Sequence, residues 1–212
     1  MKPYKLHDTY PVTGEFRPEY YRKIDLSLLT FDNESNVQTG LEAYLRSQAG
    51  DDGKSVFLYG GYLEQRNFYS GSLLFNNGVS NRNIHLGIDI WADAGTPIFA
   101  AFDGQIHSFA YNNGHLDYGA TIIIQYDAFF VLYGHLSRKS LLGLYPGKPV
   151  FKSQKIAELG RMSENGGWVP HLHIQVIKDI GSHIGDYPGL CDKETLSFYR
   201  ENCLDPDFLV LV

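Results

Sequence analysis

The chain has 212 residues, a formal net charge of −6 and 22 glycines. This length is enough for one sizeable domain, with or without a small appendage. The acidic balance and the absence of a Lys/Arg run argue against a nucleic-acid partner, because phosphate binding needs a basic surface. No apolar stretch approaches the roughly 20 residues that a transmembrane segment needs.

The ends of the chain bear on the compartment. The first residues lack the apolar segment of a signal peptide, so we expect a cytoplasmic protein; a periplasmic or secreted protein that has lost its signal is the alternative. Cys191 and Cys203 could form one disulfide, but two reduced thiols fit a cytosolic protein better.

The predicted elements begin with an irregular lead-in over residues 1–18. Apolar residues at helical spacing then predict a helix at about 36–48, which Gly50 ends. From Ser55 onward, short apolar runs broken by Gly, Asn, Asp and Pro predict an antiparallel sheet or sandwich. We expect strands at 56–59, 84–90, 97–101, 104–110, 121–126, 129–135, 155–160 and 171–178. A last short helix is expected near 193–201.

Two segments, 94–100 and 145–151, each place a Gly-x-Pro turn before an apolar strand, which indicates a duplicated hairpin unit. The fold class is therefore mainly β, an antiparallel sheet or sandwich core with short N- and C-terminal helices. We divide the chain into an N-terminal extension with one helix (1–55), a core domain (56–180) and a C-terminal tail that packs on it (181–212).

The sharpest local pattern is His171-Leu172-His173. Residues i and i+2 of a strand point to the same face, so the two imidazoles project together while Leu172 faces the core. That geometry suits a metal ligand beside a proton-transfer group. A chain with eight histidines often contains such a pair by chance, so the context has to decide.

A second pair, His85 and Asp89, flanks Gly87, which lets the backbone bend or approach a neighbour closely. Ile88 and Ile90 alternate about Asp89, so the carboxylate should face away from them. A carboxylate in an apolar strand is costly unless a cation neutralises it. The cation would be a metal ion or an Arg.

The remaining five histidines are not part of these two motifs. His135 ends an apolar run directly after Gly134, a place where functional side chains often lie, although a structural role is the alternative. His107 is expected to be a hydrogen-bonded structural residue. We expect His7, His115 and His183 at the surface, and among these three His115 is the best placed to line a cleft.

Taken together, the motifs H-x-G-x-D at 85–89, Y-G-H at 133–135 and H-x-H at 171–173 resemble the M23 family of lysostaphin-type zinc metallopeptidases. The turns at 94–97, 103–104 and 165–168 match as well, and the resemblance covers roughly residues 57–180. Residues 84–94, 165–173 and 185–189 are similar to the M23 module that some proteins carry fused to class III aminotransferase domains.

The resemblance implies that His85, Asp89 and His173 bind Zn²⁺, and that His135 and His171 are the unligated catalytic pair. It implies a zinc-dependent metalloendopeptidase that hydrolyses peptidoglycan-type or glycine-rich peptides through a zinc-bound water. His171 is the expected base, and His135 the expected acid or oxyanion stabiliser. Tyr118, Tyr133 and Trp168 are interpreted either as groove walls or as packed aromatics.

Two other functions stay open. One is a non-catalytic, zinc-binding regulatory module of the same fold; the presence of all five site residues favours an enzyme over it. The other is a histidine phosphocarrier-like domain, which the Gly-x-Pro hairpins resemble. The carboxylate of Asp89 would repel an incoming phosphate but would attract a metal. The sequence carries no signal for the oligomeric state.

Overall fold

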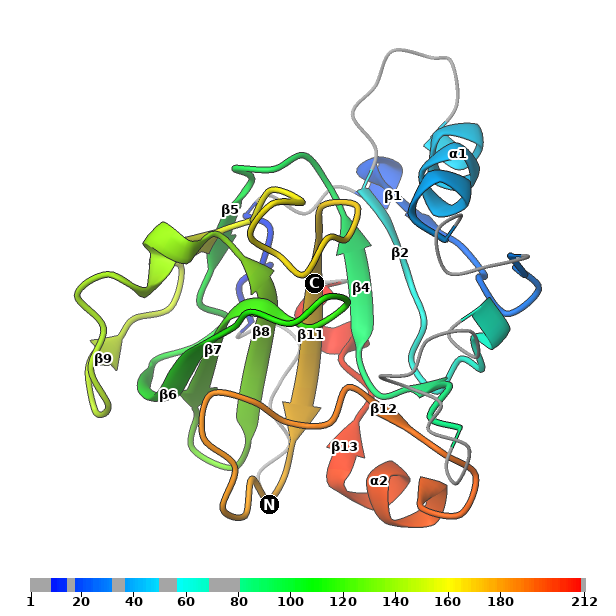
Figure 1. Ribbon diagram of the computed structural model, residues 1–212. Helices are drawn as coiled ribbons and strands as arrows, with labels where there is room; N and C mark the ends of the chain where they lie inside the picture. Colours follow the sequence, from blue (N-terminus) through cyan, green and yellow to red (C-terminus); the bar gives the residue numbers. More distant parts are fainter. Residues whose placement is uncertain (1–8, 15–17, 32–36, 50–56, 69–80, 211–212) are drawn as a thin grey trace.

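A mixed β-sheet dominates the computed structural model, which describes residues 9–14, 18–31, 37–49, 57–68 and 81–210. Its strands are Tyr21–Lys23 (β1), Phe57–Gly60 (β2), Ile88–Trp91 (β4), Gly104–Asn112 (β6), Gly119–Gln125 (β7), Phe130–Leu136 (β8), Pro149–Val150 (β9), His171–Ile177 (β11) and Cys203–Leu204 (β13). The strand order is β1-β2-β4-β11-β8-β7-β6-β9, with β13 also paired to β11 (Figure 1). The pairing of β1 with β2 is parallel, and the other pairings in this sheet are antiparallel.

The remaining elements are small. Two short ladders pair Pro97–Phe99 (β5) with Lys155–Glu158 (β10), and Ile84–His85 (β3) with Leu190–Cys191 (β12). The helices are Val37–Ala49 (α1), Leu196–Asn202 (α2) and Asp207–Val210 (α3), with 3₁₀ turns at Pro18–Tyr20 and Arg138–Leu141. No helix in the described part of the chain is long and apolar enough to cross a bilayer. The mainly β class with N- and C-terminal helices is therefore confirmed.

Several predicted boundaries needed correction. The strand expected at 84–90 is two strands, because Leu86 and Gly87 interrupt it. Strand β3 pairs with β12, whereas β4 pairs with β2 and β11 in the main sheet. The two similar Gly-x-Pro segments do not close local hairpins: β5 pairs with β10, and β9 pairs with β6. Strand β1 and helix α3 were not predicted. Residue 36, where helix α1 was expected to begin, and Gly50, which was expected to end it, lie outside the described residues.

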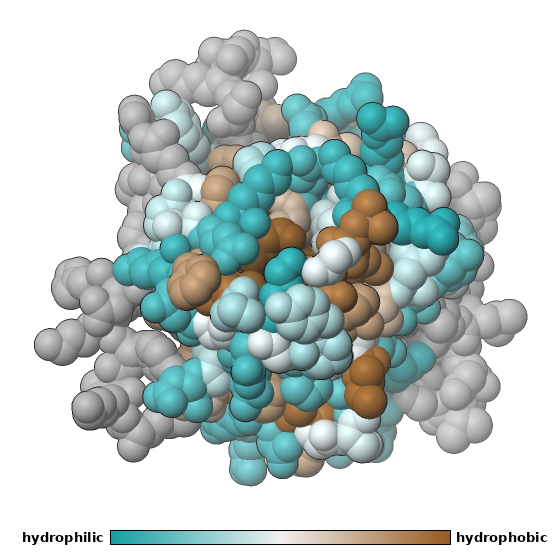
Figure 2. All heavy atoms as spheres, turned by 90° about the vertical axis from the view of Figure 1, so that its left-hand side faces the viewer, coloured by the Kyte–Doolittle hydropathy of each residue, from teal (hydrophilic) through white to brown (hydrophobic). Residues whose placement is uncertain are grey.

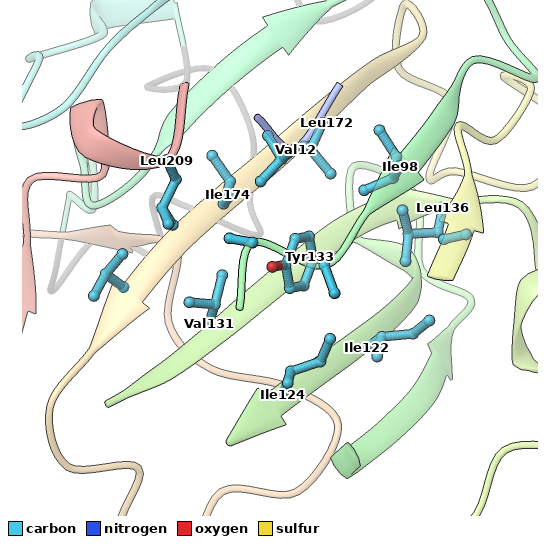
Figure 3. Close-up of a cluster of buried hydrophobic side chains, with 14 of the residues drawn as sticks. Val12, Ile98, Ile122, Ile124, Val131, Tyr133, Leu136, Leu172, Ile174 and Leu209 are labelled. Carbon is cyan, nitrogen blue, oxygen red and sulfur yellow. The ribbon is translucent and has the colours of Figure 1, made fainter. Parts of the chain in front are cut away.

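The hydrophobic core lies against one face of the sheet. Strand alternation sends the side chains of Leu172 and Ile174 from β11, Val131 from β8, and Ile122 and Ile124 from β7 to this face. Figure 3 shows these residues together, and they are covered by Val12, Ile98 and Leu209, which come from distant parts of the sequence. The opposite face of the same strands carries the polar side chains of His171, His173 and Gln175, and also a further buried apolar cluster that includes Ile123, Leu132 and Ile177.

Strand β8 contains an irregularity that matters for the site. In a regular strand Tyr133 and His135 would share a face. Here His135 has a φ of 59°, in the left-handed region, and the pairing of β7 with β8 shifts register between Ala120 and Ile122. The shift leaves Tyr133 in the core, where its hydroxyl lies 2.9 Å from that of Tyr126. Of the two interpretations of Tyr133, the packed aromatic is therefore confirmed and the groove wall is excluded.

The edge of the sheet at β9 is short, as edge strands that avoid pairing with other chains usually are. Figure 2 looks onto this side of the molecule and shows hydrophobic side chains scattered among hydrophilic ones. Exposed apolar residues of the chain around β9 are Leu142, Tyr145 and Phe151. Scattered exposed apolar side chains are normal on a folded protein and carry no functional implication by themselves.

The core predicts a clear stability contrast. Ile124 is fully buried, so Ile124→Ala should lower the free energy of unfolding by about 2–5 kcal/mol through lost burial and a residual cavity. Leu142 is 79% exposed, so the control Leu142→Ala should change it by less than about 0.5 kcal/mol. Urea denaturation of both variants measures the difference, and equal losses would contradict this placement of the core.

Candidate active site

The polar face of the sheet brings the predicted motifs together. Asp89 on β4 lies directly opposite His173 on the neighbouring antiparallel strand β11. Side chains at such paired positions point to the same face and lie within contact distance. His85 reaches the same place from β3. Its backbone pairs with β12 and with Leu63 and Glu64, not with the main sheet.

Three ligating atoms converge there. His173 Nδ1 lies 2.9 Å from His85 Nε2 and 3.1 Å from Asp89 Oδ1, and His85 Nε2 lies 3.4 Å from Asp89 Oδ1. All three side chains are buried. Within the described residues, this is the group of His, Cys, Asp and Glu side chains whose geometry could hold a metal ion.

The hydrogen bonds of the two histidines assign their protons. His85 Nδ1 lies 3.0 Å from the carbonyl oxygen of Gly61, and His173 Nε2 lies 3.0 Å from Gln175 Oε1. Both partners only accept, so these two nitrogens carry the protons. His85 Nε2 and His173 Nδ1 are then bare lone pairs that face each other and the Asp89 carboxylate. Three buried acceptor atoms this close together are unfavourable unless a cation lies between them.

A zinc ion fits this triangle. Ligand atoms ~2.05 Å from zinc at the corners of a tetrahedron lie roughly 3.3 Å apart, close to the three distances observed. Two neutral imidazoles and one carboxylate are also a donor set that zinc prefers, and three protein ligands are typical of catalytic rather than structural sites. The outer hydrogen bonds to Gly61 and Gln175 are the kind that orient metal-binding histidines.

Burial and neighbouring charges keep the site in its metal-binding protonation state. Burial, together with the charge of Arg66, lowers the pKa of His85 to about 4. Burial alone would raise the pKa of the Asp89 carboxyl, but His85 and Arg66 beside it hold that pKa well below its usual range. The imidazole is therefore neutral and the carboxylate ionised near neutral pH, as metal ligation requires.

His135 and His171 stand beside the three ligating residues. Their ring centroids are 4.1 Å apart, and His171 Nε2 lies 3.8 Å from Asp89 Oδ1. Each donates its Nδ1 proton to a backbone carbonyl, His135 to Asn165 and His171 to Val169. The Nε2 atoms are consequently left as proton acceptors. Burial lowers the pKa of both, that of His135 well below its usual range.

A glycine makes this crowding possible. A Cβ at position 87 would lie 2.6 Å from the carbonyl oxygen of Ile174 and 2.8 Å from the ring of His173. These distances are too short for any side chain, so the third residue of H-x-G-x-D is fixed by the close approach of the His173 ring. The functional motif and the local packing thus impose the same residue.

Gln175 is a further site residue that the sequence reading did not single out. It is fully buried on the polar face of β11, two positions after His173. Its amide nitrogen donates to the carbonyl of Pro188 and to Cys203 Sγ, which holds the amide oxygen toward His173. The period of two along the strand, which placed His171 and His173 together, also places Gln175 there.

Both cysteines are free, buried thiols, as the sequence reading favoured. Burial raises the pKa of Cys203 to about 11 and that of Cys191 to about 12. Neither is a metal ligand in this geometry. Cys203 acts as a hydrogen-bond acceptor for Gln175.

The five histidine and aspartate side chains lie at the bottom of a cavity of about 250 Å³. Its walls come from three loops and from Arg82, and include Leu116, Asp117, Tyr118, Trp168, His183, Asp186, Tyr187 and Leu190. In Figure 1 the loop after β6 crosses in front of β8 and β11, on the side away from the core. Tyr118 and Trp168 therefore line the cavity, and each also packs against a buried hydrophobic cluster.

Of the three histidines expected at the surface, His115 and His183 are exposed, and His7 lies outside the described residues. His183 lines the cavity, whereas the exposed His115, which was expected to be the better placed, is not among the lining residues. The loop that carries residues 182–189 folds over the site, and no local signal in its sequence announces this. His107 makes a 2.8 Å hydrogen bond to Ser108 Oγ, in keeping with the structural role predicted for it.

Residues 83–184 match the model of peptidase family M23. The matched segment contains all five predicted site residues. The chain therefore carries a domain of peptidase family M23. The comparison with curated proteins found no match. The more specific resemblance to modules fused to class III aminotransferases stays a prediction, as does the division of the chain at residues 55 and 180.

Solved structures of similar fold include a mutant catalytic domain of EnpA, a prophage-encoded M23 protein from Enterococcus faecalis. It is 22% identical, over 73% of this chain and 92% of that chain, with a TM-score of 0.46. The catalytic domain of the antimicrobial peptidase lysostaphin from Staphylococcus simulans is also 22% identical, over 67% and 88% of the two chains, with a TM-score of 0.40. A zinc-containing peptidase from Vibrio cholerae is 26% identical over 47% and 29%, with a TM-score of 0.36.

The buried neutral histidines predict a pH dependence of stability for the metal-free protein. Below the unfolded-state pKa of 6.5 the unfolded chain takes up protons that folded His85 refuses until about pH 4. Stability is therefore lost as the pH falls through this window, by about 1.4 kcal/mol per pH unit for each such group.

Because His135 behaves in the same way, His135→Gln should reduce this slope. Urea denaturation in the presence of a chelator, at about pH 7 and at about pH 5, measures it. Identical slopes for the wild type and the variant would show that His135 is protonated equally in both states.

Proposed function

We propose that the chain is a zinc-dependent metalloendopeptidase. The observation that supports this most directly is the convergence of His85 Nε2, Asp89 Oδ1 and His173 Nδ1 beside two further imidazoles with free Nε2 atoms. A zinc ion held by these three residues would supply a Lewis acid that polarises a carbonyl group and activates water at neutral pH. Membership of the M23 family supports the same reading.

The two unligated histidines would move the protons. His171 Nε2 lies on the side of Asp89 and the ligand triangle, and its Nδ1–H is fixed by Val169. We assign it as the base that accepts a proton from the attacking water. His135, whose Nδ1–H is fixed by Asn165, starts with an unprotonated Nε2; after the proton taken from the water has passed to it from the neighbouring His171, this Nε2 would donate a hydrogen bond to the developing oxyanion or deliver the proton to the leaving amine.

The backbone carbonyl partners of these histidines have a chemical consequence. Each fixes one tautomer, so each Nε2 begins as an acceptor and becomes a donor only after it has taken a proton. A peptide bond that enters the cavity therefore meets two groups that can pass a proton from one side of the scissile bond to the other. Tyr118 and Trp168 would form the walls against which the peptide packs.

For the substrate, we propose peptides of the peptidoglycan type or glycine-rich peptides, as the family resemblance implies. Incubation of the zinc-loaded protein with muropeptides, pentaglycine peptides and a small peptide library, followed by mass spectrometry, tests this. Products cut at one type of bond would identify the substrate class. Zinc binding without hydrolysis of any member would favour the non-catalytic, zinc-binding alternative.

The assignment of roles predicts opposite outcomes for two substitutions. His173→Ala removes a metal ligand and should abolish stoichiometric zinc binding together with activity. His135→Ala should keep zinc and lower kcat by about 10²–10⁴-fold, the usual contribution of a positioned proton-transfer group. Metal analysis of the purified variants beside a peptidase assay measures both.

His107→Gln is the matched control, because His107 lies on β6 with a hydrogen bond to Ser108 and outside the cavity. It should keep both zinc and turnover. Full activity in either site variant would overturn the roles assigned here. A phosphohistidine formed from a phosphodonor, with no metal bound, would favour the phosphocarrier alternative.

A further inference from the structure

We infer that Arg66 is a positioning residue for the proposed metal centre: it orients Asp89 so that only one carboxylate oxygen is available to a metal ion. Arg66 lies in a segment that precedes the residues matched by the family model. Arg66 Nη1 donates to Asp89 Oδ2 at 2.6 Å, and both side chains are buried. The inference rests on the proposed metal site, but its test does not depend on peptidase activity.

The hydrogen bond from Arg66 gives the two carboxylate oxygens of Asp89 different roles. Oδ2 is taken by Arg66, while Oδ1 faces His85 and His173. A free carboxylate can rotate or bind a metal through both oxygens. With Oδ2 fixed by a charge-assisted hydrogen bond, Oδ1 alone is presented, and the fourth corner of a tetrahedral site stays open.

Arg66 is in turn fixed by Glu64. Its Nε donates to Glu64 Oε2 at 2.6 Å, and Glu64 Oε1 accepts the backbone N–H of Leu26 at 2.9 Å. A rigid relay therefore runs from the backbone of residue 26 through Glu64 and Arg66 to the ligand Asp89. The family match begins at residue 83, so the relay's three supporting residues all precede it.

Charge alone does not explain this arrangement. A cation beside Asp89 would by itself repel an incoming metal ion and weaken its binding. The ion pair with Glu64 offsets part of the Arg66 charge, but that charge still lowers the pKa values of His85 and Asp89, so its electrostatic effect on an incoming metal ion is unfavourable. What remains is geometry: the planar guanidinium presents fixed donors to two carboxylates at once, which the ammonium group of Lys cannot reproduce.

A second contact extends the influence of Arg66 to His171. The guanidinium carbon lies 6.0 Å from the centroid of Trp91, and the Trp91 ring stacks on His171 at 5.8 Å with an interplanar angle of 27°. Trp91 is thus placed between Arg66 and the proposed base. Arg66 therefore contacts the proposed ligand Asp89 directly and the proposed base His171 through Trp91.

The tight packing around Arg66 shows that its place is specific. A Cβ at position 61 would lie 2.1 Å from Arg66 Nη2 and 2.9 Å from His85 Nδ1. The chain therefore requires glycine where it passes between the positioning arginine and the ligand histidine. The carbonyl of that glycine is the group that fixes His85.

The test measures zinc affinity by competition with a chromogenic chelator, at constant pH and ionic strength, on the full chain. We expect Arg66→Met to weaken zinc binding by about 10–100-fold, the usual cost of removing an outer partner of a ligand. Arg66→Lys, which keeps the charge but loses the fork, should also weaken it. The exposed Arg138, which stacks on Tyr111, supplies the control Arg138→Met, which should bind zinc like the wild type.

The direction in which the zinc affinity changes distinguishes a positioning role of Arg66 from a purely electrostatic one. If Arg66 acted only through its charge, Arg66→Met would bind zinc more tightly and Arg66→Lys would bind it unchanged, and either result overturns the inference. If Arg66→Met does not give a folded protein by circular dichroism, Arg66→Lys decides alone. The absorption spectrum of the Co²⁺-loaded variants is the second readout: a weaker visible band would report a higher coordination number, as expected when Asp89 is free to bind through both oxygens.

Failure of this inference and failure of the proposed function give different results. Wild-type protein that binds zinc and hydrolyses no peptide would contradict the peptidase proposal and leave the role of Arg66 to be decided by the affinities. Wild-type-like zinc affinity in Arg66→Met and Arg66→Lys would overturn the positioning role while peptidase activity stands. Wild-type protein that fails to bind zinc would overturn both.

Discussion

The site depends on one electrostatic constraint: three buried acceptor atoms from distant parts of the chain face one another without a donor among them. His85 Nε2, His173 Nδ1 and Asp89 Oδ1 are brought within 3.4 Å by strand pairing, although their lone pairs repel. The second polar atom of each of these side chains makes a hydrogen bond that holds the side chain in place: His85 with Gly61, His173 with Gln175, and Asp89 with Arg66. The fold holds this arrangement because the opposite face of the same strands is a continuous hydrophobic core.

Around the site, the two faces of the sheet carry different side chains. On β11, Leu172, Ile174 and Val176 enter the core, His171 and His173 line the cavity, and Gln175 is fully buried on the same side of the strand as the two histidines. Strand β8 achieves the same division only by breaking its alternation at His135, whose left-handed backbone turns the imidazole to the polar side. Non-glycine residues in this conformation are uncommon and are found disproportionately at functional sites.

Much of this was accessible from the sequence, for physical reasons that differ between parts of the site. The strand period placed His171 and His173 on one face, and the resemblance to the M23 motifs assigned His85, Asp89 and His135 to the same proposed site; the structure places all five side chains around one cavity. The sequence left Tyr133 open between a groove wall and a packed aromatic, because a bulge is not visible as periodicity. Arg66 and Glu64 were missed because they lie in a connection between strands, with no spacing rule that relates them to Asp89, 23 residues later in the sequence. The N-terminal strand β1 escaped notice because Tyr21-Arg22-Lys23 has no apolar alternation.

The three ligating residues do not belong to one hydrogen-bonded unit. Asp89 and His173 sit side by side within the nine strands of the main sheet that the described residues form, whereas the backbone of His85 is held by the two-residue ladder with β12 and by residues 63 and 64. Short ladders open locally at far lower free energy than the centre of a large sheet. Fraying of this ladder withdraws one imidazole and leaves the other two ligands in register. At the proposed metal site, local opening of this short ladder would therefore let an ion leave or be exchanged while the hydrophobic core stays closed.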